Sequence, residues 1–176
     1  KELPPLTELV HEVEMTPQQK SMRETLFSGG HLKKLDETGI EEIIENKGTL
    51  GEMIRDLQIA SHPLLLGGDD TPTNKWPLLR EIVENRGGEQ VIVWSYHPIT
   101  IEWICRMLEG LGVKSSYVHG KVGAEKRDEI RKAFIAGEFP VLVANPMSYA
   151  EGVNLQNASI MAYWDESYSK HLWEQS

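Results

Sequence analysis

The chain has 176 residues, of which 40% are apolar and 26% are charged, so its length suggests one domain with a small helical appendage. It has no run of about eighteen apolar residues and no basic leader before an apolar stretch. We therefore expect neither a membrane span nor export, and an intracellular protein of cytoplasm or nucleus. The net charge of −9 excludes a surface that grips nucleic acid wherever it touches, so any DNA contact must come from a local patch.

The first half of the chain, residues 1–86, is predicted to be a linker and a mainly helical accessory region. Thr16 is a favourable N-cap, Pro17 fits the first helical position, and Gln19 stands where a capping box needs it. These residues predict a helix over 17–27. Apolar residues recur later with roughly helical spacing, and the further helices that this predicts span residues 37–46, 49–60 and 73–86.

The second half, residues 87–176, alternates short apolar strands with helices after the break at Gly87 and Gly88. This alternation of strands and helices predicts a parallel α/β sheet with right-handed crossovers, whose functional loops lie at the carboxyl ends of the strands. We expect strands over residues 91–94, 113–119, 141–144 and 159–164, with helices from residue 98 and over 124–136. The loops then begin at Ser95, His119, Asn145 and Asp165.

Three segments carry a family resemblance that covers most of residues 55–176. Residues 57–63 are similar to Leu-Arg-Gln-Ile-Cys-Asn-His-Pro, and residues 119–121 (His-Gly-Lys) are similar to Asp-Gly-Ser/Thr. The sharpest match is residues 151–158, which resemble the Gly-Leu-Asn-Leu-x-x-Ala segment called motif V. Together they resemble the C-terminal RecA-like (helicase C) lobe of Swi/Snf-type superfamily-two DNA-dependent ATPases. The resemblance implies a RecA-like parallel sheet flanked by helices.

This resemblance implies two groups of site residues. On the side of the ATP cleft it places Gly152, Asn154, Asp165 and Gln175. In contact with DNA it places Ser95, Tyr96, Gly120, Lys121, Ser148 and Tyr149. The DNA group also has a chemical basis, because a glycine at a strand end lets a phosphate approach the backbone while a lysine supplies charge. The alternative for these loops is a solvated turn or an ordinary helix start, and residues 148–150 are bulkier than the family's Ala-Gly-Gly.

Phosphoryl transfer needs a phosphate cradle with a lysine, a carboxylate that holds Mg²⁺ and a cation for the developing charge. No Gly-x-x-x-x-Gly-Lys-[Ser/Thr] occurs in this sequence. Asp165 and Glu166 resemble paired Mg²⁺-holding acids, but without a phosphate loop before them Asp165 is interpreted as ordering the loop after its strand. The six histidines and one cysteine do not lie at metal-binding spacing, so no metal site is expected. Arg127 is interpreted as structural, paired with a nearby acid such as Glu125, Asp128 or Glu129.

The family's motif VI arginines, which reach the γ-phosphate, are expected beyond Ser176, so no catalytic residue is assigned and the isolated chain is expected to be inactive. ATP and Mg²⁺ are then cofactors of a parent ATPase and translocase, and none should bind this part tightly. The expected partners are the N-terminal RecA-like lobe and duplex DNA, held by sequence-independent phosphate contacts, with no membrane.

The alternative to a motor lobe is a non-enzymatic α/β binding or regulatory module, such as a receiver-like or scaffold domain. A receiver needs an acidic cluster after an early strand and a phosphorylatable Asp after a middle strand, and the strand ends Ser95-Tyr96 and Asn145-Pro146 supply neither.

Overall fold

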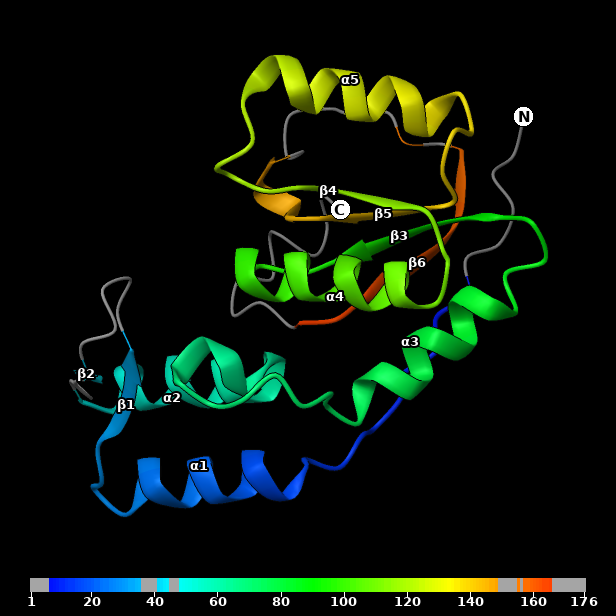
Figure 1. The fold of residues 1–176 in the computed structure, drawn as a ribbon. Helices are drawn as coiled ribbons and strands as arrows, with labels where there is room; N and C mark the ends of the chain where they lie inside the picture. Colours follow the sequence, from blue (N-terminus) through cyan, green and yellow to red (C-terminus); the bar gives the residue numbers. More distant parts are fainter. Residues whose placement is uncertain (1–6, 36–40, 45–47, 149–154, 156, 166–176) are drawn as a thin grey trace.

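A four-stranded parallel sheet with helices on both faces forms the second half of the molecule (Figure 1). The computed structural model describes residues 7–35, 41–44, 48–148, 155 and 157–165. The elements in chain order are α1 (Pro17–Phe27), β1 (Leu32–Leu35), β2 (Glu41–Ile44), α2 (Gly48–Ser61), η1 (Pro63–Leu66), α3 (Lys75–Glu84), β3 (Gln90–Trp94), α4 (Pro98–Gly110), β4 (Ser115–Val118), α5 (Ala124–Ile135), β5 (Val141–Ala144), η2 (Pro146–Ser148) and β6 (Ala158–Tyr163).

The strands of this sheet lie in the order β4-β5-β3-β6, and every neighbouring pair is parallel. Successive side chains of a strand point to opposite faces, so the central strand β3 serves two cores. Val91 and Val93 face a core that α3 and α4 close, whereas Ile92 and Trp94 face a core that α5 closes. Uninterrupted apolar strands are typical of a sheet covered on both sides. The predicted RecA-like parallel α/β architecture is confirmed.

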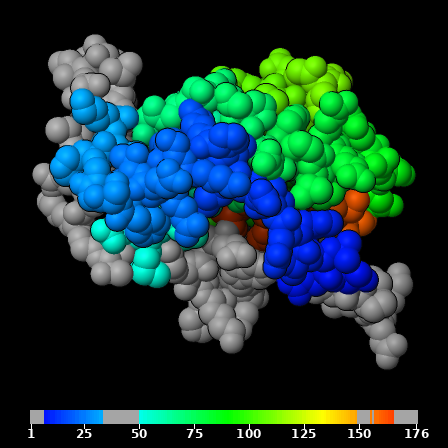
Figure 2. All heavy atoms as spheres, turned by 90° about the horizontal axis from the view of Figure 1, so that it is seen from below, coloured from blue at the N-terminus to red at the C-terminus, as the bar shows by residue number. Residues whose placement is uncertain are grey.

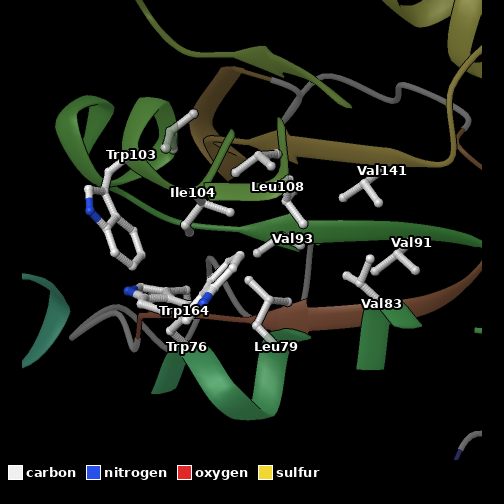
Figure 3. Close-up of a cluster of buried hydrophobic side chains, with 12 residues drawn as sticks. Trp76, Leu79, Val83, Val91, Val93, Trp103, Ile104, Leu108, Val141 and Trp164 are labelled. Carbon is white, nitrogen blue, oxygen red and sulfur yellow. The ribbon is translucent and has the colours of Figure 1, made fainter. Parts of the chain in front are cut away.

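The core on the α3 and α4 side contains three tryptophans, which lie together at one end of it (Figure 3). Trp103 of α4 is 1% exposed, and its ring centroid lies 5.7 Å from that of Trp76 and 5.9 Å from that of Trp164. Trp76 belongs to α3, so the region expected to be accessory contains a helix that packs against the sheet. The Trp164 indole N–H donates to the Ser61 carbonyl oxygen at 2.9 Å, which joins the end of α2 to the same core.

The N-terminal part has its own small core, formed by Leu26, Leu32, Ile59 and Leu66. The Gln19 side chain spans α1 and α2 by donating to the Ile59 carbonyl oxygen at 2.8 Å. Figure 2 shows the blue N-terminal residues running across this face toward the green residues of the later chain. Asn74 anchors that run, because its amide donates to the Glu14 carbonyl oxygen at 2.9 Å.

The predicted helix over residues 17–27 is confirmed, with its capping box. The Thr16 N–H donates to Gln19 Oε1 at 2.9 Å, and the Gln19 N–H donates to Thr16 Oγ1 at 3.3 Å. The helix predicted over 37–46 is wrong, because residues 41–44 pair antiparallel with β1. A short apolar run fits a strand or a helix equally well by periodicity, and here the pairing partner decides. Across the described residues, no helix is long and apolar enough to cross a membrane.

The imidazole of His62 is buried where α2 meets the tryptophan core. It has no exposed surface, and its ring centroid lies 4.4 Å from that of Trp103. Its Nδ1 accepts the Leu64 N–H at 3.2 Å, while Nε2 is buried without a hydrogen-bond partner in the described part of the chain. Burial lowers the pKa of His62 below its ordinary 6.5; Asp70 and Asp69 oppose this shift and Arg106 adds to it.

This lowered pKa predicts a pH dependence of stability. The folded chain binds the His62 proton less readily than the unfolded chain, so the stabilisation is present above pH 6.5 and is lost as pH falls toward the folded pKa. We expect His62→Asn, which keeps an acceptor for the Leu64 N–H and does not titrate, to lose less free energy of unfolding than the wild type between pH 7.5 and 5.5. Urea denaturation at both pH values measures this, and equal losses in the two proteins would contradict it.

Candidate functional site

The carboxyl ends of the four parallel strands bring the predicted loops to one edge of the sheet. Of the predicted site residues, the structure places Ser95 and Tyr96 after β3, Gly120 and Lys121 after β4, Ser148 after β5 and Asp165 after β6. Tyr149, Gly152, Asn154 and Gln175 lie outside the described residues. Because β6 and β4 are the outer strands of the sheet, the edge has one end at Asp165 and the other at Lys121. The two ends differ in burial and in chemistry.

At the first end, Ser95 and Asp165 form a buried polar pair. The Ser95 hydroxyl donates to Asp165 Oδ2, and the Tyr96 N–H donates to the same oxygen at 3.1 Å. Ser95 has no exposed surface and Asp165 is 6% exposed. The Ser95 hydroxyl is therefore engaged and shielded from solvent, so the phosphate contact predicted for it is not available in this arrangement. Instead, Ser95 joins the ends of two neighbouring strands.

The Asp165 carboxylate also has a free acceptor, because its Oδ1 is buried and has no hydrogen-bond partner in the structure that is described. A buried acceptor without a donor is costly, so such an atom marks a place where a ligand or another segment can supply one. Nearby His97 is the N-cap residue of α4. Burial lowers the pKa of His97; the Asp165 carboxylate opposes this and the Lys75 ammonium adds to it. The Lys75 ammonium donates to the Trp164 carbonyl oxygen at 2.8 Å.

At the second end, the loop after β4 is open. Gly120 and Lys121 are both exposed, and a Cβ built at Gly120 would meet no atom within 4 Å. His119 stands before them and is 3% exposed. Its Nδ1 accepts the Lys121 N–H at 3.3 Å, and its Nε2 lies 3.0 Å from Glu102 Oε1 on α4. This loop thus has an exposed backbone and one exposed ammonium group, and it is bonded to the buried side chain of His119.

The loop after β5 is tied to both neighbouring strand ends by Asn145. Its Nδ2 donates to the Tyr96 carbonyl oxygen at 3.0 Å, and its backbone N–H donates to the Val118 carbonyl oxygen at 2.8 Å. Its Oδ1 accepts the Met147 N–H at 2.9 Å. Sequence reasoning placed a loop start at Asn145 and assigned it no role. The available signal was an amide side chain directly after a buried strand and before a proline.

Arg127 bonds to a main-chain oxygen, which differs from the acid pairing suggested for it. Its Nη1 donates to the Ser148 carbonyl oxygen at 3.4 Å, across to the loop after β5. Two of the acids expected to pair with it are bonded elsewhere, since Asp128 pairs with Arg131 and Glu129 pairs with Lys126. The helical register explains this, because neighbours three or four residues apart face each other and adjacent residues do not.

The described residues offer neither a metal site nor a reactive thiol. Among them, no group of three His, Cys, Asp or Glu side chains could hold a metal ion. Burial raises the pKa of the Cys105 thiol to about 11. A thiol with such a pKa carries almost no thiolate at neutral pH and is a poor nucleophile.

The parallel sheet, its two helical layers and the loops at one carboxyl edge define a RecA-like lobe. The family model described as helicase conserved C-terminal domain matches residues 74–176, more than half of the chain. The chain belongs to this family of helicase C-terminal domains. The matched range begins just before α3, the helix whose Trp76 packs into the tryptophan core.

Similar proteins fall into two groups. UvrABC system protein B of Cytophaga hutchinsonii is 30% identical over 135 residues, which cover 76% of this chain and 18% of the relative. The ATP-dependent RNA helicase RhlB of Shewanella halifaxensis is 32% identical over 91 residues, covering 52% of this chain and 21% of the relative. This chain therefore spans about a fifth of the length of these relatives.

Solved structures show the same fold. The Sulfolobus solfataricus SWI2/SNF2 ATPase C-terminal domain has a TM-score of 0.67 and 21% identity, covering 87% of this chain and 69% of that one. The Sulfolobus solfataricus SWI2/SNF2 ATPase core in complex with dsDNA has a TM-score of 0.68 and 22% identity, covering 88% of this chain and 34% of that one. At these identities the likeness concerns the fold.

Proposed function

We propose that this chain is the second motor lobe of a DNA-dependent ATPase and translocase of the Swi/Snf type, and that it forms one side of the ATP cleft between two lobes. The observation that carries the proposal is the difference between the two ends of the carboxyl edge of the sheet. One end holds a buried carboxylate with an acceptor that no described residue satisfies, and the other holds an exposed glycine and lysine. The first end suits a cleft that closes on a nucleotide, and the second suits a backbone phosphate.

The site residues divide accordingly. We assign Gly152, Asn154, Asp165 and Gln175 to the cleft. To the DNA track we assign Tyr96, Gly120, Lys121, Ser148 and Tyr149, with Ser95 acting through its bond to Asp165. A phosphate needs a donor or a cation at the surface, which Lys121 supplies. Contacts of this kind carry no sequence preference.

ATP and Mg²⁺ fit this lobe only as ligands that it shares with the other lobe. ATP supplies the phosphoryl group for transfer. The described residues offer the free acceptor of Asp165 to the cleft, but they contain no three-ligand metal cluster, and the sequence has no phosphate loop. We assign the phosphate cradle and the metal-holding acids to the other lobe. No step of hydrolysis runs through residues of this chain alone.

We expect the isolated chain to show no ATP hydrolysis above buffer, with or without a 20-base-pair duplex, because half of the catalytic machinery lies elsewhere. The measurement is phosphate release at saturating ATP and Mg²⁺, compared with the same chain joined to its N-terminal lobe in the parent protein. Duplex DNA should stimulate the joined form. Robust DNA-stimulated ATP hydrolysis by the isolated chain would contradict the proposal.

Lys121→Ala is expected to weaken duplex binding of the chain and to lower the slope of log K against log salt by about 0.9, the value for one phosphate contact. Fluorescence anisotropy with labelled 20-base-pair DNA at several salt concentrations measures both quantities. Lys132→Ala is the matched control, since Lys132 lies in the last turn of α5, far from this loop, and pairs with Asp128. An unchanged slope in Lys121→Ala would remove this residue from the DNA track.

Single-stranded RNA belongs in the same assay as a competitor, since some relatives are named RNA helicases. The preference for duplex DNA is supported by the fold shared with the SWI2/SNF2 core in complex with dsDNA. Tighter binding of RNA would move the proposal from a DNA translocase to an RNA-directed member of the same family. Binding of neither nucleic acid would favour a non-enzymatic binding or regulatory module.

A further inference from the structure

We propose that His119 and Glu102 form a positioning pair that sets the backbone of the Gly120-Lys121 loop for contact with a phosphate. The inference rests on the proposed function, since it takes this loop to be a DNA contact. It adds a residue on α4 that no loop motif contains. The pair acts through the loop and does not itself touch the phosphate.

The hydrogen bonds determine which nitrogen of His119 carries the proton. Nδ1 accepts the Lys121 N–H at 3.3 Å and therefore carries no hydrogen itself. Nε2 then carries the hydrogen and donates it to Glu102 Oε1 at 3.0 Å. The two hydrogen bonds fit one tautomer, because in a neutral imidazole one nitrogen donates and the other accepts.

The imidazole is held in this orientation from several sides. It is 3% exposed, and it stacks on the Tyr117 ring with 5.3 Å between centroids and 9° between planes. The backbone closes the same turn, since the His119 carbonyl oxygen accepts the Val122 N–H at 2.9 Å. Both the side chain and the main chain of His119 thus accept N–H groups from the loop that follows.

The exposed part of the loop is left for a ligand. Gly120 has open space where a side chain would stand, and Lys121 is exposed although its own N–H is bonded to His119. Fixing the loop before binding removes an entropic cost of ordering it on the phosphate. Loss of the His119 acceptor should therefore weaken phosphate binding even though the Lys121 charge remains.

The test compares His119→Ala, which has no acceptor, with His119→Asn, whose side-chain oxygen can accept the N–H two residues on as in an Asx turn. Duplex binding by the chain at low salt should weaken about tenfold in His119→Ala, the effect of one lost hydrogen bond, and should largely recover in His119→Asn. Glu102→Gln keeps an acceptor for Nε2–H and should bind nearly as the wild type does, whereas Glu102→Ala should not. Thermal denaturation of each variant reports folding separately.

A double-mutant cycle separates positioning from a general structural role. If His119 acts through the loop, His119→Ala should cost little further affinity in a Lys121→Ala background, because coupled residues are not additive. Additive losses, or a His119→Ala variant that binds as tightly as the wild type, would overturn the inference.

Nitrogen NMR of the imidazole in the chain without DNA should show the Nε2–H tautomer, and the other tautomer would also overturn the inference. A wild-type chain with this tautomer that binds no duplex would instead refute the proposed function, and the phosphate role of the pair with it.

Discussion

Trp103→Ala is expected to cost about 3–5 kcal/mol of the free energy of unfolding, the range for a fully buried large aromatic side chain. Trp103 is 1% exposed and packs against Trp76, Trp164 and His62, which come from three separate segments of the chain. Its removal opens a cavity where α3, α4 and the end of α2 meet. Because a domain has about 5–15 kcal/mol of stability in total, this single change should remove a large part of it.

Urea denaturation followed by circular dichroism measures the Trp103 effect. Trp103→Phe keeps an aromatic ring and should lose less, which keeps the comparison useful if the alanine variant does not fold. Phe27→Ala is the matched control, because Phe27 is 52% exposed at the end of α1 and should change stability by less than about 1 kcal/mol. A loss at Trp103 no larger than at Phe27 would contradict the central place of the tryptophan core.

Ser95→Ala is expected to destabilise the chain by about 1–3 kcal/mol, more than a serine-to-alanine change at a surface. The variant leaves the Asp165 carboxylate buried with the Tyr96 N–H as its one remaining donor among those described. A buried charged acceptor that loses a donor bears the cost of its lost solvation. The same change removes one of the two hydrogen bonds that join Asp165 to the residues after β3, beside the proposed cleft.

Ser148→Ala provides the comparison at the same edge of the sheet, since Ser148 is half-buried and takes part through its main chain in the hydrogen bonds described. It should change the free energy of unfolding by less than about 0.5 kcal/mol. The double variant of Ser95 and Asp165 completes a cycle whose coupling energy reports the pair directly. Equal stabilities of Ser95→Ala and Ser148→Ala would show that the serine hydroxyl does not support the carboxylate.

Much of the architecture could be predicted because local patterns carry it. The apolar run of residues 91–94 is typical of a strand covered on both faces. The Thr16 capping box defines the start of α1 within its own first turn. The hairpin of β1 and β2 was missed because its strands are only four residues long, where strand and helix periodicity cannot be told apart.

The candidate site was predicted in position and not in orientation. Strand ends and sheet chirality place Ser95, Gly120 and Asp165 at one edge. Whether a residue there points to solvent or inward depends on which strand lies next to it. Ser95 points inward to a carboxylate, while Gly120 meets open space.

By itself, the sequence determined the parallel α/β class, the order of the loops and their common edge, since these follow from periodicity, turn residues and the handedness of crossovers. Only the tertiary structure decided the pairings that span it, such as Ser95 with Asp165 and Trp164 with Ser61, 70 and 103 residues apart in the chain. These depend on β3 lying beside β6 and on α3 closing the core. That arrangement is the joint result of packing by many side chains, and no local spacing encodes it.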